Sequence, residues 1–139
     1  MVTIYLPGDP VPASRPRVTV NGTYTPKRYR RWKAAARDTM ALAYRAEPMI
    51  GPLTVVVDAY WRRPKRLGEG PREPKPLGCD IDNQAKGVLD AANGILYVDD
   101  RQVTELIVRK WYAGSRQNPG VEVTVMSAVG GTDCTKETA

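Results

Sequence analysis

Apolar and polar positions alternate in some segments of the chain and recur at helical spacing in others. Alternation at residues 2–6 and 53–61 predicts two half-buried β-strands, and two further β-prone segments follow at residues 103–111 and 121–126. Between these strands, two segments place apolar residues three and four positions apart, which is the spacing of an amphipathic helix. The pattern therefore predicts four main strands and two main helices.

Both helices have recognisable boundaries. Thr25-Pro26 is typical of an N-cap with proline at the first helical position, and the first helix should run to about Ala46. The second helix should begin at Asp82 or Asn83 and end at Asn93-Gly94. The apolar stripes comprise Trp32, Ala35, Ala36, Met40 and Ala43 in the first helix, and Ala85, Val88, Leu89 and Ala92 in the second.

The order of the elements predicts the fold class. Asn21-Gly22 has the composition of a type I′ turn and predicts a small two-stranded ribbon, whereas residues 62–78 lack any apolar period and predict a mobile basic loop. Strand, ribbon, helix, strand, helix, strand and strand together predict an α+β fold, with two main helices packed on one face of a mixed β-sheet. We expect a single small domain over residues 1–128 and a flexible C-terminal tail over residues 129–139.

The absence of histidine narrows the possible chemistry. It excludes Ser-His and Cys-His nucleophile pairs, histidine-ligated zinc and imidazole acid-base catalysis. The two cysteines, Cys79 and Cys134, make neither a disulfide framework nor a zinc site. Any catalysis must therefore use carboxylates, lysine, arginine or metal-bound water.

The sequence predicts neither a secretory signal nor a membrane span. Residues 1–7 lack a charged segment, a long apolar segment and a small-residue cleavage site. The longest apolar runs, such as Leu53 to Val57, fall far short of the ~20 residues that cross a bilayer. We expect a cytoplasmic protein with no membrane partner.

A net charge of +6 favours an anionic partner, because clustered Lys and Arg gain affinity by releasing counterions from a phosphate backbone. Two basic clusters flank the strand at residues 53–61, and we expect both to line a groove that binds DNA, the second as a loop that orders on DNA. Any one of these residues, taken singly, fits a solvated surface better. The first cluster comprises Arg15, Arg17, Lys27, Arg28, Arg30, Arg31 and Lys33, and the second comprises Arg62, Arg63, Lys65, Arg66, Arg72 and Lys75.

Acidic residues gather around the start of the second helix. Asp80 precedes the helix in extended chain and Asp82 follows two residues later, so both carboxylates can point toward one place. Asp82, Lys86 and Asp90 share the polar side of the helix. The turn at Asp99-Asp100 can add a third carboxylate, because the intervening chain is long enough to finish the helix and double back.

Two or three aspartates and a phosphate oxygen suit Mg²⁺, which prefers oxygen ligands and usually keeps several waters. The ion stabilises charge on a phosphate in transfer and lowers the pKa of bound water. This water supplies the nucleophile, which is needed because the chain has no histidine to activate one. Lys86 could neutralise the developing charge or position the attacking water. We expect Mg²⁺ as the cofactor, with Mn²⁺ as an alternative ion.

Each of these residues also has an ordinary structural interpretation. Asp82 suits a helix N-cap, where an anion is favoured by the helix dipole. Lys86 and Asp90 suit a surface ion pair at i, i+4, and Asp99-Asp100 suits a plain turn. Spacing alone leaves the metal site and these structural roles open as alternatives.

The same residues carry a resemblance to a known family. The chain resembles RusA-like Holliday-junction resolvases in a D-x-D-N-x-x-K segment followed by a D-D-x-Q-V turn. The order, the gap and the turn agree together over residues 80–103, which makes the match specific. Arg15-Pro16-Arg17 and Tyr24-Thr25-Pro26 are similar to the opening of many phage-encoded members. The matching residues are Asp80, Ile81, Asp82, Asn83, Lys86, Gly94, Tyr97, Val98, Asp99, Asp100, Gln102 and Val103.

The resemblance implies an enzyme, a crossover junction endodeoxyribonuclease that cuts four-way junctions by paired symmetric nicks in DNA recombination and repair. It implies that Asp80, Asp82 and Asp100 hold the divalent metal and that Lys86 is the essential basic residue. Asn83 corresponds to an asparagine beside the site, and Asp90 and Asp99 correspond to supporting positions. The family fold is a small α+β homodimer, which gives two active sites related by a two-fold axis.

Two other functions fit parts of the sequence. In a non-catalytic basic DNA-binding module, the aspartates would be caps and turns and the basic clusters would carry all function. In a metal-dependent enzyme acting on nucleotides, the same carboxylates would serve small phosphates, although no Gly-rich phosphate cradle is evident. The first alternative predicts that Asp80→Asn leaves DNA binding unaltered or stronger and that no Mg²⁺-dependent product forms.

Overall fold

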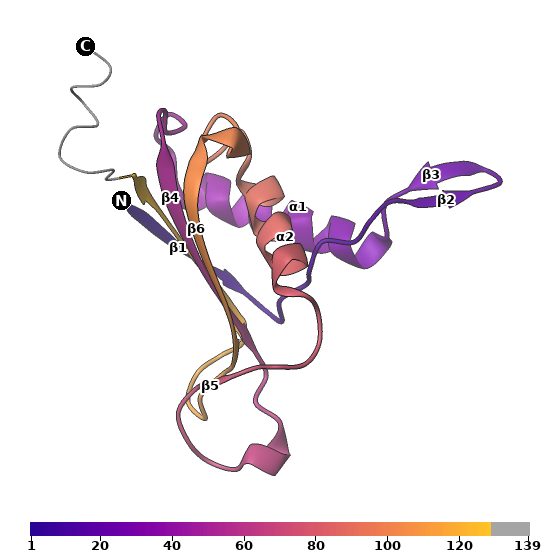
Figure 1. The fold of residues 1–139 in the computed structure, drawn as a ribbon, viewed down its shortest axis with the longest axis vertical. Coiled ribbons are helices and arrows are strands. Elements are labelled where there is room, and N and C mark those ends of the chain that lie inside the picture. Colours follow the sequence, from indigo (N-terminus) through magenta and orange to yellow (C-terminus); the bar gives the residue numbers. More distant parts are fainter. Residues whose placement is uncertain (129–139) are drawn as a thin grey trace.

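A computed structural model describes residues 1–128 and shows a five-stranded sheet with two helices on one face (Figure 1). The strand order is β1-β7-β4-β6-β5, and a separate ribbon consists of β2 and β3. The predicted α+β class and mixed sheet are confirmed. The strands are β1 (Val2–Pro7), β2 (Arg17–Thr19), β3 (Gly22–Tyr24), β4 (Leu53–Trp61), β5 (Glu73–Pro74), β6 (Val103–Tyr112) and β7 (Gly120–Ser127), and the helices are α1 (Lys27–Ala43) and α2 (Ile81–Ala92).

The parallel pair β4 and β6 determines where the ends of α2 lie. β4 pairs with β6 in parallel, whereas β7 pairs antiparallel with β1 and β4. Parallel neighbours need a crossover, and α2 provides it by running back along the sheet. The start of α2 therefore lies toward the carboxyl ends of β4 and β6, and its end lies near their beginnings (Figure 1).

The core lies between the sheet and the two helices. Alternate residues of β4 and β7 point to the helices and are almost fully buried, as the alternation predicts. From the helices, Met40 and Val88 are fully buried against them, and Trp32 packs at the edge of this core. The remaining stripe prediction for α1 is wrong at Ala35 and Ala43, which are exposed.

Within residues 1–128 no helix covers the opposite face of the sheet (Figure 1), which carries several polar cross-strand pairs. Asp58 pairs with Arg109 at 3.2 Å and accepts a hydrogen bond from the Trp111 indole at 2.9 Å. Thr54 donates to Glu105 across the same two strands. These cross-strand pairs satisfy the polar groups that alternate with the core residues.

One edge of the sheet is largely uncovered. β5 pairs with β6 only at Trp111 and Tyr112, so among the described residues no strand lies beside Val103–Arg109 on that side. Leu106 and Ile107 on this edge are exposed, as is Ile81 at the start of α2. An unpaired strand edge flanked by apolar side chains is a template for pairing with another chain.

Several predicted boundaries differ in the structure. The N-cap of α1 is Pro26 and not Thr25, no side chain caps the helix, and α1 ends at Ala43, before Ala46. The ribbon turn lies one residue earlier than expected, at Val20-Asn21, with Gly22 at φ 118°. No residue other than glycine has positive φ in residues 1–128, so a type I′ turn is wrong there.

Some expectations lie beyond these observations. The tail at residues 129–139 and Cys134 lie outside the described residues. Neither α1 nor α2 is long and apolar enough to pass through a bilayer. Cys79 is a free thiol.

Candidate active site

Two carboxylates stand free at the start of α2. Asp80 occupies the N-cap position in extended conformation but makes no side-chain cap hydrogen bond, and Asp82 lies in the first turn. Both are exposed, and neither carboxylate forms a hydrogen bond or an ion pair within residues 1–128. The alternative interpretation of Asp82 as the helix N-cap is therefore wrong, because Asp80 occupies that position. Both carboxylates are available to a cation or a ligand at the positive end of the helix dipole.

Lys86 lies one turn after Asp82 and is also exposed. The alternative of a Lys86–Asp90 ion pair is wrong for this structure, since no such pair forms within residues 1–128. Asp90 instead accepts a hydrogen bond from the Tyr29 hydroxyl at 3.2 Å. Burial, and then the nearby charge of Asp90, raise the pKa of Tyr29, which keeps this hydroxyl protonated as a donor.

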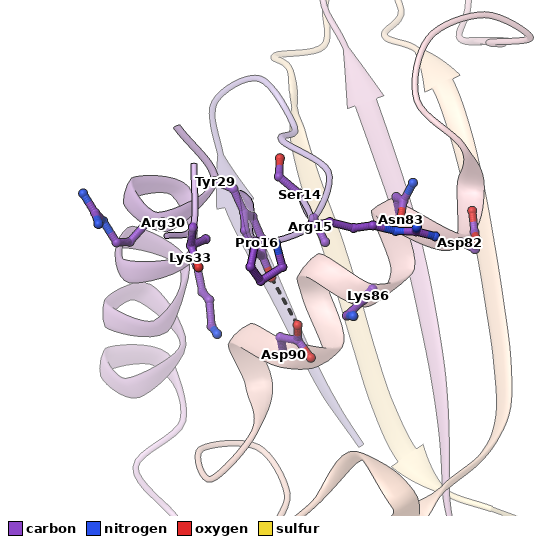
Figure 2. Close-up of a pocket in the computed structure, with 12 residues that line it drawn as sticks. Ser14, Arg15, Pro16, Tyr29, Arg30, Lys33, Asp82, Asn83, Lys86 and Asp90 are labelled. Carbon is purple, nitrogen blue, oxygen red and sulfur yellow. Dashed lines mark hydrogen bonds between the residues drawn. The ribbon is translucent and has the colours of Figure 1, made fainter. Parts of the chain in front are cut away.

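A polar cleft of about 580 Å³ runs along this side of α2 between the N-terminal segment and α1 (Figure 2). Figure 2 shows the Arg15 side chain extended along the helix toward Asn83 and Asp82, with Lys86 and Asp90 on the same side. Asn83 is half-buried in its wall. The lining residues are Ala13, Ser14, Arg15, Pro16, Thr25, Tyr29, Arg30, Lys33, Asp82, Asn83, Lys86 and Asp90.

A close backbone approach fixes one wall of this cleft. The Ala13 amide donates to the Asn83 carbonyl at 2.9 Å, which ties the N-terminal segment to the first turn of α2. A Cβ on Gly87 would lie 3.3 Å from that amide nitrogen and 3.5 Å from the Tyr29 ring. Glycine at position 87 therefore permits the contact that places Arg15 over the cleft. Gly87 was not among the predicted site residues, and its only signal in the sequence is a glycine inside a helical pattern.

Asp99 and Asp100 lie near the other end of α2. Asp99 caps the short 3₁₀ helix Asp100–Gln102 in a reciprocal capping box with Gln102. The hydrogen bond from the Arg101 amide lowers the pKa of Asp99. Asp100 lies close enough to Tyr97 to raise the pKa of that phenol, after burial, and Tyr97 donates to the Leu89 carbonyl in the last turn of α2.

The three aspartates thus do not meet within one chain. Asp82 and Asp90 are eight residues apart on α2, which is about 12 Å along the axis, and Asp100 lies beyond the Asp90 end. Within residues 1–128, no group of three acidic or cysteine side chains is close enough to share a metal ion. The expectation that the chain doubles back to bring Asp100 to Asp80 and Asp82 is wrong for a single subunit.

Comparison with known proteins identifies the family. Residues 7–126, most of the chain, match the family model described as Endodeoxyribonuclease RusA. The chain belongs to the RusA family of endodeoxyribonucleases. It is also similar to the uncharacterized protein YqaN of Bacillus subtilis (strain 168), with 34% identity over 137 residues that cover 88% of this chain and 92% of that protein. RusA membership supports a nuclease that acts on DNA and resolves Holliday junctions.

The first basic cluster of this RusA-family chain surrounds the cleft. Arg15, Arg30 and Lys33 line it together with Lys86. The other members lie exposed on the ribbon and on the first turns of α1, beside the cleft mouth; they are Arg17, Lys27, Arg28 and Arg31. No acidic residue occurs between Pro10 and Arg37. The cleft therefore joins the free carboxylate of Asp82 to a basic surface.

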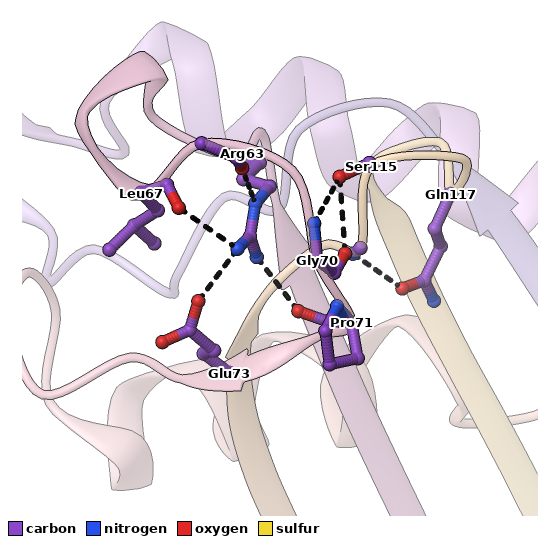
Figure 3. Close-up of polar contacts among 9 residues, drawn as sticks. Arg63, Leu67, Gly70, Pro71, Glu73, Ser115 and Gln117 are labelled. Carbon is purple, nitrogen blue, oxygen red and sulfur yellow. Dashed lines mark hydrogen bonds and ion pairs between the residues drawn. The ribbon is translucent and has the colours of Figure 1, made fainter.

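The second basic cluster is partly structural (Figure 3). The Arg63 guanidinium, with its side chain only 10% exposed, pairs with Glu73 at 2.7 Å and donates to the carbonyls of Gly68 and Pro71. Its position does not support the expectation that Arg63 contacts DNA, because its donors are used inside the loop. Arg62, Lys65 and Arg66 are exposed, so DNA contact by these three residues stays a prediction.

The loop at residues 62–78 has more structure than its composition predicts. It contains a 3₁₀ turn at Lys65–Leu67 and the short strand β5. Arg72 stacks over the Trp111 ring at 4.2 Å, and Lys75 lies over the Trp61 ring at 4.9 Å. Burial and the nearby Lys110 lower the pKa of Lys75. The predicted basic loop therefore contains short regular elements that its composition did not indicate.

The end of this loop delivers Asp80 to its position. The Lys110 ammonium donates to the Cys79 carbonyl at 2.6 Å, which fixes the residue before Asp80 against β6. Burial raises the pKa of the Cys79 thiol. Asp80 and Asp82 thereby lie at the start of α2, with Lys86 one turn further along the helix and Arg15 reaching over the first turn (Figure 2). Such a set can hold a hard cation and the oxygens of a phosphate.

Proposed function

We propose that this protein is a Mg²⁺-dependent endonuclease that resolves Holliday junctions and related branched DNA by paired symmetric nicks. The observation that carries the proposal is the pair of free carboxylates, Asp80 and Asp82, at the start of α2 in a RusA-family chain. Asp82 lines a basic cleft together with Lys86. In a non-catalytic binding module, these two aspartates would repel the phosphates of DNA and weaken binding, unless a cation lay between the carboxylates and the phosphates. Two aspartates that neither cap the helix nor form ion pairs therefore favour a metal site over a binding module.

The residues present fit a divalent ion. Asp80 and Asp82 offer carboxylate oxygens that no protein group uses, which suits Mg²⁺, and Mn²⁺ as its substitute. The bound ion would supply an activated water and neutralise phosphate charge. Lys86 and Arg15 bind the non-bridging oxygens of the scissile phosphate and orient it toward the carboxylates. Asn83 positions the wall against which that phosphate lies.

Pairing of two subunits at the free edge of β6 would complete the site. An antiparallel partner strand centred near Leu106 fills Val103–Arg109 and stops where β5 begins. The same contact covers Ile81 and Leu106, which line a small groove between α2 and β6 together with Asp82, Ala85 and Val108. The free edge is therefore the surface that we assign to the homodimer.

This pairing would also bring in the third carboxylate. With the two-fold axis at Glu105 or Leu106, Asp100 of the partner subunit lies level with residues 110–112 of β6. Lys110 there holds the Cys79 carbonyl, next to Asp80. Each metal site would thus contain Asp80 and Asp82 from one subunit and Asp100 from the other. The two sites related by the axis can make the paired nicks.

The test uses a labelled four-way junction, a linear duplex of matched sequence, and a titration of Mg²⁺. We expect the wild-type protein to nick the junction symmetrically, and Asp82→Asn to lose at least about a hundredfold in rate while binding the junction as well or better. Asp38→Asn, an exposed acid on α1 that does not line the cleft, is the matched control and should retain activity. Wild-type binding without any Mg²⁺-dependent product would favour the binding module instead.

A further inference from the structure

The ribbon of β2 and β3 projects away from the sheet and both helices (Figure 1). Every residue of its two strands is exposed. Val18 is 82% exposed, and Val20 at the turn is fully exposed. A two-stranded ribbon is only marginally stable on its own. Apolar side chains at its tip contribute no burial energy while they remain in solvent. These valines therefore point to a partner.

The charge around the ribbon identifies the chemistry of that partner. Residues 10–37 contain eight Lys and Arg and no Asp or Glu. A second copy of the ribbon or of the adjoining face of α1 would meet the same positive charge and be repelled. A polyanion would be attracted, and a two-stranded ribbon is of a size that DNA grooves admit. The occupant favoured by these observations is DNA.

Apolar tips suit a particular feature of DNA. Base edges in the grooves are mostly hydrogen-bonding groups, which valine cannot satisfy, and the thymine methyl group is their one apolar feature; the faces of bases, by contrast, are apolar and are covered by stacking in a continuous duplex. A branch point interrupts this stacking and exposes base faces. Apolar side chains that insert between base steps are known in proteins that kink DNA. The tip therefore matches an interrupted duplex better than an intact one.

The position of the ribbon relates this contact to the site of cleavage. Both of its roots, Arg15-Pro16 and Thr25, line the cleft that contains Asp82 and Lys86. The four residues from Pro16 to Val20 span about 13 Å in extended conformation. A base pair held at the tip is thus within about four nucleotide steps, at ~3.4 Å each, of a phosphate held in the cleft.

We propose that Val18 and Val20 pack on base faces exposed at the branch point and so direct the nuclease to branched DNA. This inference rests on the proposed function for its substrate, but its own observable is a contact with unstacked bases. Arg17, Lys27 and Arg28 bind the flanking phosphates and hold the ribbon in the opening.

The test compares V18T/V20T with wild type. Threonine preserves the shape and β-branching of valine, so the ribbon keeps its strand preference while the apolar contact is lost. Ile50→Thr, an equally exposed β-branched residue outside the cleft and the ribbon, is the matched control. One assay measures 2-aminopurine fluorescence at the branch of a four-way junction with Ca²⁺ in place of Mg²⁺, and the other measures cleavage of junction and linear duplex.

We expect wild type and Ile50→Thr to raise the fluorescence at the branch, and V18T/V20T to lose most of that rise. Junction cleavage by V18T/V20T should fall about tenfold, with binding of linear duplex unchanged. Equal fluorescence and an equal preference for the junction in all three proteins would overturn the inference. A protein that unstacks the branch through these valines but yields no Mg²⁺-dependent product would refute the proposed function and leave the ribbon contact standing.

Discussion

A heterodimer of two inactive variants tests whether each metal site draws on both subunits. Two carboxylates on one Mg²⁺ lie within about 4 to 5 Å of each other, because each Mg–O bond is about 2.1 Å. Within one chain Asp82 and Asp100 are separated by most of the length of α2, where eight residues alone span about 12 Å. Asp82→Asn and Asp100→Asn should therefore each abolish cleavage as homodimers, for lack of one ligand.

Co-expression with two different tags isolates the heterodimer of these variants. One of its two sites then lacks both carboxylates, and the other combines an intact Asp82 with an intact Asp100. We expect about half of the wild-type nicking rate, with single nicks in place of paired ones. The assay is gel separation of nicked and resolved products from a labelled four-way junction.

The reciprocal heterodimer makes the test decisive. When one subunit carries both substitutions and the other is wild type, each shared site lacks one ligand, so we expect no cleavage. If all three carboxylates came from one chain, the outcomes would be reversed: the first heterodimer would be inactive and the second would keep one working site. That reversed pattern would refute the geometry inferred from β6.

Three further predictions concern the fold that supports the site. Gln84 is fully buried and its amide has no hydrogen-bond partner in residues 1–128, so Gln84→Met should stabilise the protein by about 1 to 2 kcal/mol, seen as a higher urea midpoint; a lower midpoint would show that the amide is satisfied. Gly87→Val should displace Ala13 from α2, reduce stability by about 1 to 3 kcal/mol and weaken junction cleavage; unchanged values in both assays would contradict the role of this close approach. Burial raises the pKa of Tyr29 and Tyr97 above the ordinary value of 10, so the stability that these two phenols contribute should be constant below pH 10 and be lost as the pH rises above it; the fall above pH 10 should be smaller in Tyr29→Phe, and an equal fall in that variant would contradict the assignment.

The strands and the second helix could be predicted from the sequence because their burial is periodic. The alternation at residues 53–61 and the stripe at Ala85, Val88 and Ala92 correspond to faces that the structure buries. The aspartate motif at Asp80 and Asp82, where we propose the metal site, is equally evident in the sequence, because it depends on local spacing at one helix end. Information of this kind is carried within a few residues of the chain.

The relation of Asp100 to that motif could not be predicted, because it depends on strand direction. An antiparallel return would have brought Asp100 back to the start of α2. The parallel pairing of β4 and β6 sends α2 along the length of the sheet and leaves Asp100 at its far end. Parallel and antiparallel connections of this length have no distinct local signal in a single sequence.

Arg63 shows the same limit for a single side chain. In sequence it is one of several neighbouring cations, and only the path of the loop determines that its guanidinium faces Glu73 and three carbonyls while Arg62 faces solvent. Gly87 likewise gains its role from a segment more than seventy residues earlier in the chain. Both residues are defined by tertiary contacts rather than by composition.

The uncovered edge of β6 has a consequence for how the enzyme responds to its own abundance. If each metal site needs residues from both subunits, then an isolated subunit is inactive and dilution should abolish cleavage. The nicking rate should then increase more steeply than the protein concentration until dimerisation saturates. Such a nuclease would be monomeric and inactive at low concentration. Its threshold would be set by the strength of one strand pairing, so substitutions at Leu106 should move that threshold without touching the chemistry.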